Sequence, residues 1–408
     1  MTTLIQHPYQ KRFFLAALIV AVLAYLFWTG SRYPALDEKA MMSGAIQLED
    51  SLSFEAKFPV TQDMSIAQRI FWSTFNWVNT NKKGMTFGVL FAAAFLTAAA
   101  YIRQRSFRGG FANSALGLAI GTPLGVCVNC AAPIARGMYS SGLRAETTLS
   151  AMIASPTLNV VVLTMLFSLM PVYMAITKVA FSLLIILALV PLICRFLPQT
   201  QLPADQQIAS PTPWSTEELG AAPKETLPEA LIGVVVGYAK NLWYIIVKTV
   251  PLMLLAGFLG TVVAVALPGE MIMDLPFSVL VLVVLVAIGV FLPVPIGFDV
   301  VMAGVLLASG LEHGYVMALL FTLGSFSVYS FMIVVQALGA RAGWMMAAAV
   351  ALCGAVTGAG VHYYHEWQSD RALKMLYGEA PTPWLAAHAS TAQPDPAPQV
   401  TSADAAAI

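Results

Sequence analysis

Residues 121–159 read GTPLGVCVNCAAPIARGMYSSGLRAETTLSAMIASPTLN. This stretch is mostly apolar, yet residues that interrupt an α-helix recur along it: Gly121, Pro123, Gly125, Pro133 and the Ser155-Pro156 step. Backbone that leaves the helix at membrane depth survives only where protein surrounds it or where it lines a water-filled cavity. If the flanking sequence spans a membrane, we therefore expect this stretch to lie inside the protein and away from lipid.

The composition indicates that the flanking sequence belongs to a membrane protein. Of the 408 residues, 58% are hydrophobic and only 10% are charged, whereas soluble proteins carry roughly 25% charged residues. The mean hydropathy is +0.76. The formal net charge is zero, so nucleic acid is not an expected partner. We predict an all-α polytopic membrane protein whose helices contact the lipid bilayer.

The alternation of apolar and polar runs predicts five segments. They are an N-terminal anchor helix with an external loop (1–62), a first membrane repeat (63–197), a proline-rich cytoplasmic linker (198–228), a second membrane repeat (229–365) and a disordered tail (366–408). No small-x-small cleavage site follows the first apolar run, so we expect the anchor to remain uncleaved. Each repeat is expected to begin with an aromatic amphipathic helix, at 66–78 and at 231–248, that lies at the membrane interface.

The distribution of arginines predicts the orientation. Arg103, Arg105 and Arg108 directly follow the second apolar run, and such clusters mark the cytoplasmic side. We expect seven full spans and two re-entrant hairpins, at 111–140 and 276–309. The N-terminus and the linker then lie in the cytoplasm, and the C-terminal tail lies outside.

The layout after residue 62 occurs twice. Residues 141–143 align with 309–311, and residues 155–159 align with 323–327, at an offset of 168 residues. Each copy contains the amphipathic helix, one span, a hairpin broken by proline and glycine, a span interrupted near its middle and a closing span. An odd number of crossings per copy makes the copies inverted repeats, which support alternating access around a site formed by broken helices. The sequence therefore predicts a permease.

Cys127 and Cys130 have the most distinctive chemistry in the broken stretch. Asn129 suits a helix N-cap and Pro133 suits the first turn of the helix that follows, which places Cys130 at a helix N-terminus. The helix dipole favours a thiolate there. Two thiolates three residues apart can chelate one soft metal or metalloid. The alternative is that both cysteines are small residues that allow close helix packing.

Ser155, Pro156 and Asn159 form the second break. Pro156 removes a backbone donor and frees a carbonyl one turn earlier. The polar side chains around it can bind either a substrate or the freed backbone groups. In the first case Ser155, Pro156 and Asn159 belong to the substrate site, and in the second the break is a kink that satisfies its own hydrogen bonds.

Asp299 is an isolated carboxylate that directly follows the break of the second hairpin. A carboxylate inside a membrane is costly and marks function by default, so we predict that Asp299 couples transport to protons. The alternative is a cap for the next helix. Lys178 is expected to extend its ammonium to the membrane interface. Arg136 and Arg144 flank the first hairpin and can either attract anions or anchor the cytoplasmic face.

At these residues the sequence resembles the ArsP-type permease family, whose members are efflux permeases associated with trivalent organoarsenicals. Residues 123–133, the turn at Gly142 and residues 155–159 carry the resemblance. It implies a multi-pass exporter of the bacterial inner membrane, with no enzymatic activity and no cofactor. The two cysteines match the family's pair, which implies that their thiolates bind a small-molecule or metalloid substrate.

Two other functions stay open. A membrane thiol-redox protein could carry electrons through Cys127 and Cys130, although such a protein is expected to place a cysteine in each half, and the second half has only Cys353. A permease for another small anion or sulfur compound would make the cysteine pair incidental. Cys194 and Cys353 stand alone in apolar runs, and we expect both to be small buried hydrophobes. The sequence also leaves room for a homo-oligomer.

Overall fold

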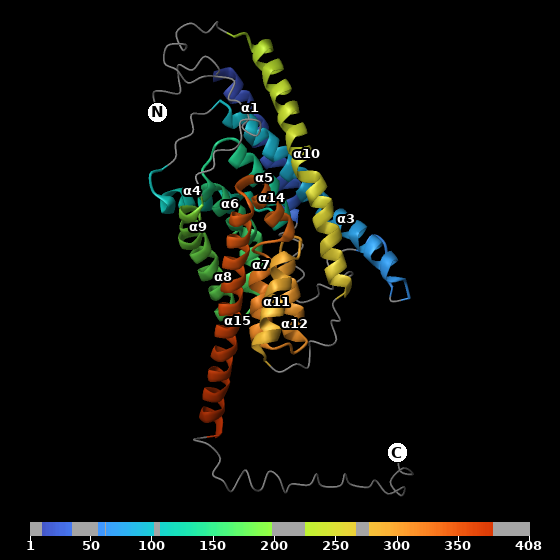
Figure 1. Cartoon of the computed structure of the whole chain (residues 1–408), viewed down its shortest axis with the longest axis vertical. Helices are drawn as coiled ribbons and strands as arrows, with labels where there is room; N and C mark the ends of the chain where they lie inside the picture. The colour runs from blue at the N-terminus through green and yellow to red at the C-terminus, as the bar shows by residue number, and fades with distance from the viewer. Residues whose placement is uncertain are drawn as a thin grey trace, which may run out of the picture. The chain divides into compact units, whose positions relative to one another are not determined.

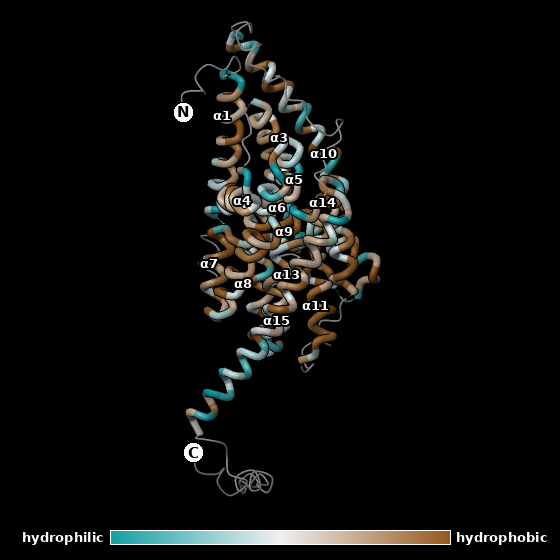
Figure 2. The backbone as a smooth tube through the Cα atoms, turned by 60° about the vertical axis from the view of Figure 1, so that its left-hand side comes forward, coloured by the Kyte–Doolittle hydropathy of each residue, from teal (hydrophilic) through white to brown (hydrophobic). Residues whose placement is uncertain are grey.

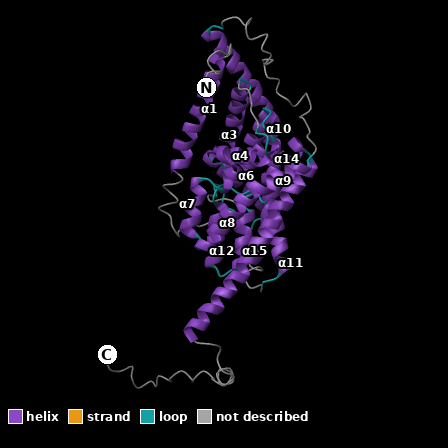
Figure 3. Ribbon diagram, turned by 90° about the vertical axis from the view of Figure 1, so that its left-hand side faces the viewer, coloured by secondary structure: helices purple, strands orange, loops and turns teal. Residues whose placement is uncertain are grey.

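The computed structural model describes residues 10–34, 56–61, 63–101, 107–197, 225–266 and 277–377. Every regular element in this described part is a helix, as Figure 3 shows. The chain consists of two compact units, residues 1–361 and 362–408, and the contacts discussed below lie within the first unless stated. The predicted external loop, linker and tail fall largely outside the described residues.

The helices follow one another along the chain in this order: α1 (Gln10–Phe27) with a terminal π-helical turn η2 (Trp28–Arg32), α3 (Ile66–Ala99), α4 (Gly110–Leu124), α5 (Val128–Ser140), α6 (Ala145–Thr157), α7 (Val160–Leu169), α8 (Val172–Leu184) with a π-helical turn η3 (Ile185–Leu189), α9 (Val190–Phe196), α10 (Leu227–Ala266), α11 (Val279–Phe291), α12 (Phe298–Ala308), α13 (His313–Thr322), α14 (Val328–Leu338) and α15 (Ala340–Tyr377). The last helix runs past the predicted start of the tail at residue 366 and ends at Tyr377.

Apolar helices dominate the described part, which confirms the predicted class of all-α polytopic membrane protein. Four segments are long and apolar enough to cross a membrane, and the bent pair α6–α7 makes a fifth if it counts as one span: Gln10–Arg32, Val172–Phe196, Leu227–Ala266, Ala340–Met375 and residues 145–169. Large apolar side chains such as Leu18, Val235 and Leu280 are exposed on the helices, as contact with lipid requires. Figure 2 shows the same composition as brown colour along α7, α8 and α11.

Two of the seven predicted spans are divided between two helices each: residues 146–170 between α6 and α7, and residues 315–338 between α13 and α14. A third, residues 84–102, lies mostly in the C-terminal half of α3. The separate amphipathic helices predicted at 66–78 and 231–248 are wrong, because α3 and α10 each continue without a break. α10 even passes through Pro251, which faces outward.

Packing between α3 and α10 explains these two long helices. The helices lie side by side in Figures 1 and 2, and they contact each other along much of their length. Trp77, expected at the membrane interface, is fully buried, and its ring leaves no room for a Cβ at Gly257 of α10. Burial of such a large aromatic surface favours a continuous helix where local sequence would allow an end.

Four breaks interrupt the apolar helices where glycine, proline and serine predicted them. α4 ends at Gly125, which has a left-handed backbone with φ of 57°, and α12 begins after Gly297, with φ of 73°. α6 and α7 meet at an angle of 43°. α13 and α14 are separated by residues 323–327. Each break exposes helix termini inside the protein.

The boundaries of the helices repeat along the chain. α6, α7 and α8 begin at residues 145, 160 and 172, and α13, α14 and α15 begin 168 residues later in each case. Gly142 and Gly310, which share this offset, both end a helix with positive φ, at 95° and 87°. The two membrane segments therefore share one order of elements, and their inverted orientation stays a prediction.

Candidate functional site

The break between α4 and α5 places Cys127 at the N-cap of α5. The Cys127 Sγ accepts a hydrogen bond from the Cys130 backbone N–H at 3.2 Å. The expected N-cap, Asn129, is instead the second residue of the helix, and Pro133 lies beyond the first turn. Gly125, in the left-handed conformation, ends α4 two residues before this cap. Cys130 still occupies the first turn of α5, as predicted.

The two sulfur atoms are joined. Cys127 and Cys130 form a disulfide in which the Cα atoms are 5.1 Å apart, and both residues are almost fully buried. The structure thus contains the oxidised form of the pair and not the two thiolates expected from the sequence. Cys353 is buried as expected, whereas Cys194 is only half-buried.

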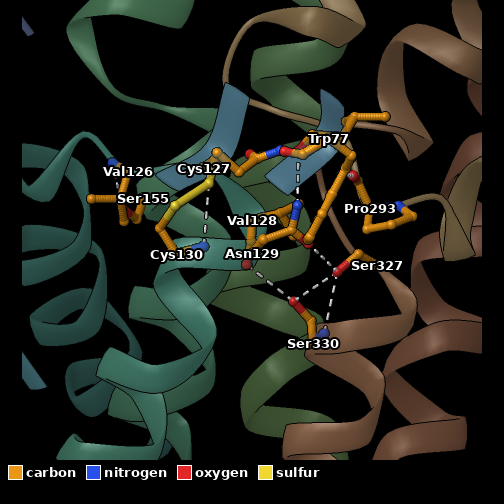
Figure 4. The surroundings of a disulfide bond; sticks show 12 residues. Trp77, Val126, Cys127, Val128, Asn129, Cys130, Ser155, Pro293, Ser327 and Ser330 are labelled. Carbon is orange, nitrogen blue, oxygen red and sulfur yellow. Dashed lines mark hydrogen bonds between the residues drawn. A yellow bond between two sulfur atoms is a disulfide. The ribbon is translucent and has the colours of Figure 1, made fainter. Parts of the chain in front are cut away.

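Asn129 connects the break of the first repeat to both breaks of the second. Its Nδ2 donates to the Val294 carbonyl at 3.1 Å, and its Oδ1 accepts from the Ser327 Oγ at 3.1 Å. Ser330 Oγ donates to the Val128 carbonyl at 3.3 Å. We call Val128, Asn129, Val294, Ser327 and Ser330 the break cluster. Figure 4 shows four of its members, Val128, Asn129, Ser327 and Ser330, near the disulfide.

A buried aromatic residue extends the same contact. The indole N–H of Trp77 in α3 donates to the Pro293 carbonyl at 2.5 Å. Pro293 precedes Val294 in the segment between α11 and α12. Backbone carbonyls that this break leaves outside any helix thus receive donors from the first repeat, as burial requires.

The side chains of the α6–α7 break mostly satisfy the break itself. Asn159 caps α7 by accepting from the Val162 N–H at 3.0 Å, and its Nδ2 donates to the carbonyls of Ser155 and Pro156. Ser155 Oγ accepts from the Val126 N–H at 3.2 Å, which joins this break to the one before Cys127. Asn159 therefore performs the structural role that the sequence left as an alternative, and Ser155 connects the two breaks.

Pro133 packs against α3. A Cβ at Gly88 would lie 3.3 Å from the Pro133 Cγ and 2.7 Å from the Cys130 carbonyl oxygen. Only glycine therefore fits at position 88, and its lack of a side chain lets α3 approach the first turns of α5. Pro133 shapes this approach and lies further along α5 than the break cluster.

Asp299 and Lys178 form a buried ion pair. The Lys178 Nζ donates to the Asp299 Oδ2, and the two side chains are 0% and 3% exposed. The expectation that Lys178 extends to the membrane interface is wrong, because a charge with a partner inside the protein is more stable there than an isolated charge. Asp299 lies in the first turn of α12, and its carboxylate leaves no room for a Cβ at Gly324 in the α13–α14 break.

The two arginines near the first hairpin have different environments. Arg136 is fully buried and its Nη2 donates to the Tyr244 hydroxyl at 2.9 Å, so it is not an anchor at the surface. Arg144 is partly exposed and forms an ion pair with Glu146 at 3.3 Å.

Among the described residues, no group of three or more histidine, cysteine or acidic side chains is arranged to hold a metal ion. The reduced form of the cysteine pair would supply two sulfur ligands, fewer than the four of a structural zinc site.

Sequence reasoning missed Ser327 and Arg32, and it assigned Lys178 to the membrane interface. Ser327 falls at the position of Asn159 under the 168-residue offset, and both are helix N-caps. Lys178 is an isolated cation in one repeat, which matches the isolated Asp299 in the other. Arg32 lies at the end of α1, and only the structure brings it to the cysteines.

Comparisons with known proteins agree with this architecture. A family model named ArsP_1 and described as a predicted permease matches residues 85–363. The UPF0718 protein YraQ of Escherichia coli (strain K12) is 24% identical over 258 residues, which cover 62% of this chain and 68% of that protein. No solved structure matches significantly. Because the family model covers more than half of the chain, the resemblance seen in the sequence is confirmed, and the protein belongs to the ArsP_1 family of predicted permeases.

Proposed function

We propose that this permease exports a small thiophilic substrate, a trivalent organoarsenical or a soft metal species, across the bacterial inner membrane by alternating access. One observation carries the proposal. Asn129, next to the cysteine pair, binds interrupted helices of the other repeat through Val294 and Ser327. Transporters form their sites from such interrupted helices at the interface between repeats.

Equivalent contacts between the repeats support a two-fold relation, which an inverted arrangement requires. α5 of the first repeat packs on α14 of the second. The equivalent helices, α12 of the second repeat and α7 of the first, also pack together. α3 and α10, a third equivalent pair, pack on each other. A two-fold relation of this kind allows the two faces of a site to open in turn, because each repeat can take the conformation of the other.

Sulfur chemistry supports the substrate class. In the reduced protein, the two thiols of Cys127 and Cys130 can replace both hydroxyls of methylarsonous acid, which forms two As–S bonds and releases two waters. Soft metals and metalloids prefer sulfur ligands, whereas the abundant hard cations prefer oxygen ligands. Substrate binding requires the dithiol, because a thiol or thiolate and not a disulfide is the ligand. The disulfide is thus an inactive form in this proposal.

We assign proton coupling to Asp299. Protonation of its carboxylate removes the negative partner of Lys178, and an unpaired ammonium in the protein interior is strongly unfavourable. The two side chains belong to different repeats, on α12 and α8. Proton uptake would therefore weaken a direct contact between the repeats, which links the proton to their relative movement.

Serine variants of the cysteines test the proposed substrate class. The full chain, expressed in an arsenical-sensitive bacterial host, should raise resistance to methylarsonous acid and lower its accumulation in cells. Cys127→Ser and Cys130→Ser should each remove this effect. Cys353→Ser is the matched control, since Cys353 is also buried but lies in α15. Full export by both single variants at equal expression would make the cysteines packing residues.

The disulfide favours a second candidate, a membrane thiol-redox carrier. A CxxC pair at a helix N-terminus is the arrangement of many thiol–disulfide exchange proteins. Trapping of thiols with a mass-tagged maleimide in growing cells separates the two functions. The carrier predicts a mixture of oxidised and reduced protein that shifts with the supply of oxidant, whereas the permease predicts a dithiol that stays reduced during export.

A further inference from the structure

A buried arginine lies beside the cysteine pair. Arg32, the last residue of the π-helical turn η2, is only 5% exposed. Its guanidinium stacks over the Phe27 ring at 4.5 Å, and its Nε has no hydrogen-bond partner. In the part of the chain that the structure describes, no carboxylate forms an ion pair with it. A buried charge without a partner is costly, so its position calls for an acceptor.

The Arg32 guanidinium and the Cys130 sulfur both lie close to Gly84 of α3. A Cβ added at Gly84 of α3 would lie 2.7 Å from the Cys130 Sγ and 3.9 Å from the Arg32 Nη2. The sulfur and the guanidinium thus approach the same point on α3. Arg32 ends a π-helical turn, and such turns are frequent at functional sites.

The N-terminus of α5 adds positive potential at the same place. Cys127 is the N-cap and Cys130 lies in the first turn of this 13-residue helix. The first N–H groups of a helix carry a partial positive charge and favour anions. A cationic ligand at this point would face both the dipole and the guanidinium, which disfavours a bare metal cation as substrate.

We propose that Arg32 and the first turn of α5 form an anion-binding subsite of the cysteine site, and that the substrate is a small anion with a soft atom. In the reduced protein the Cys130 thiol donates a hydrogen bond to the soft atom, and the charged oxygens face the Arg32 fork, whose geometry suits oxyanions. This inference rests on the proposed transport site and replaces its uncharged or cationic substrate with an anionic one. Arg32 also precedes the residues that match the family model, which begin at residue 85.

Binding to the purified, reduced full-length protein in lipid nanodiscs tests the subsite. The probes for isothermal titration are thiosulfate (soft and anionic), sulfate (hard and anionic) and methylarsonous acid (soft and uncharged). We expect thiosulfate to bind at least tenfold more tightly than sulfate. Arg32→Gln should weaken thiosulfate binding at least tenfold and Arg32→Lys by less, because lysine keeps the charge but not the fork. Lys83→Gln, which removes an exposed charge next to Gly84, should leave binding unchanged.

The outcomes separate this inference from the proposed function. One outcome is that methylarsonous acid binds the parent protein but not Cys130→Ser, while thiosulfate does not bind the parent. This outcome overturns the subsite and keeps the organoarsenical permease. Thiosulfate binding that Arg32→Gln leaves unchanged also overturns the subsite. If Arg32→Gln does not fold, the comparison of the parent with Arg32→Lys decides in the same way. Equal binding of thiosulfate and sulfate contradicts the soft-anion part of the proposal.

Discussion

Separation of the Lys178–Asp299 pair should destabilise the protein strongly. The two side chains are 0% and 3% exposed, so either charge left alone would remain in the protein interior. Breaking a buried ion pair by removal of one partner costs about 3–5 kcal/mol. We therefore expect Lys178→Met and Asp299→Asn each to lower the free energy of unfolding by about 3 kcal/mol or more.

The double variant gives the sharper result. In the double variant neither charge is present. The remaining loss in the free energy of unfolding comes from one buried amide with imperfect hydrogen bonding, about 1–2 kcal/mol. Lys178→Met/Asp299→Asn should thus be more stable than either single variant. Such non-additivity is the signature of a direct interaction.

Unfolding of the full chain in mixed micelles, followed by tryptophan fluorescence, measures all four proteins of this cycle. Glu366→Gln is the control, because its carboxylate is 60% exposed beside His362 in the second unit, and the loss of such a surface pair changes stability by about 0.5 kcal/mol or less. Single variants within about 1 kcal/mol of the parent, or effects that simply add in the double variant, would refute the buried pair.

Three further predictions follow from the same structure. Asp299→Asn should abolish transport driven by a proton gradient while substrate still binds, and full transport by this variant would reduce Asp299 to a structural partner of Lys178. Gly324→Ala places a methyl group against the Asp299 carboxylate and should lower the free energy of unfolding by about 1–3 kcal/mol. The control is Gly360→Ala in α15, where open space surrounds the glycine and no loss of stability is expected. Equal stabilities of the two variants would contradict the tight α13–α14 break. Reporter fusions after residues 205 and 380 should give opposite signals, and one shared compartment would rule out the inverted repeats.

The breaks in the helices could be predicted from sequence because glycine and proline act locally. Gly125 and Gly297 take left-handed backbone conformations, and the Ser155-Pro156 step lies where α6 ends. The repeat was visible for the same reason, since Gly142 and Gly310 end equivalent helices. Local chemistry of this kind needs no knowledge of the tertiary structure.

The long helices and the charge pair could not be predicted in this way. The sequence predicted a separate helix at 231–248, but α10 packs on α3 and continues through Pro251. Lys178 and Asp299 are 121 residues apart, and each resembles an ordinary isolated charge until the fold brings them together. Arg32 and Cys130 come close to the same residue, Gly84, only through the packing of α1 on α3. These features depend on contacts between distant segments, which a local pattern does not contain.

Transport by the purified protein tests the central claim most directly. The full chain is reconstituted into liposomes under reducing conditions, and methylarsonous acid uptake is followed by arsenic mass spectrometry with and without an imposed proton gradient. The proposed function predicts gradient-dependent uptake by the parent and by Cys353→Ser, and none above protein-free liposomes for Cys127→Ser/Cys130→Ser. Equal uptake by the parent and the double variant would contradict a substrate pathway through the cysteine pair.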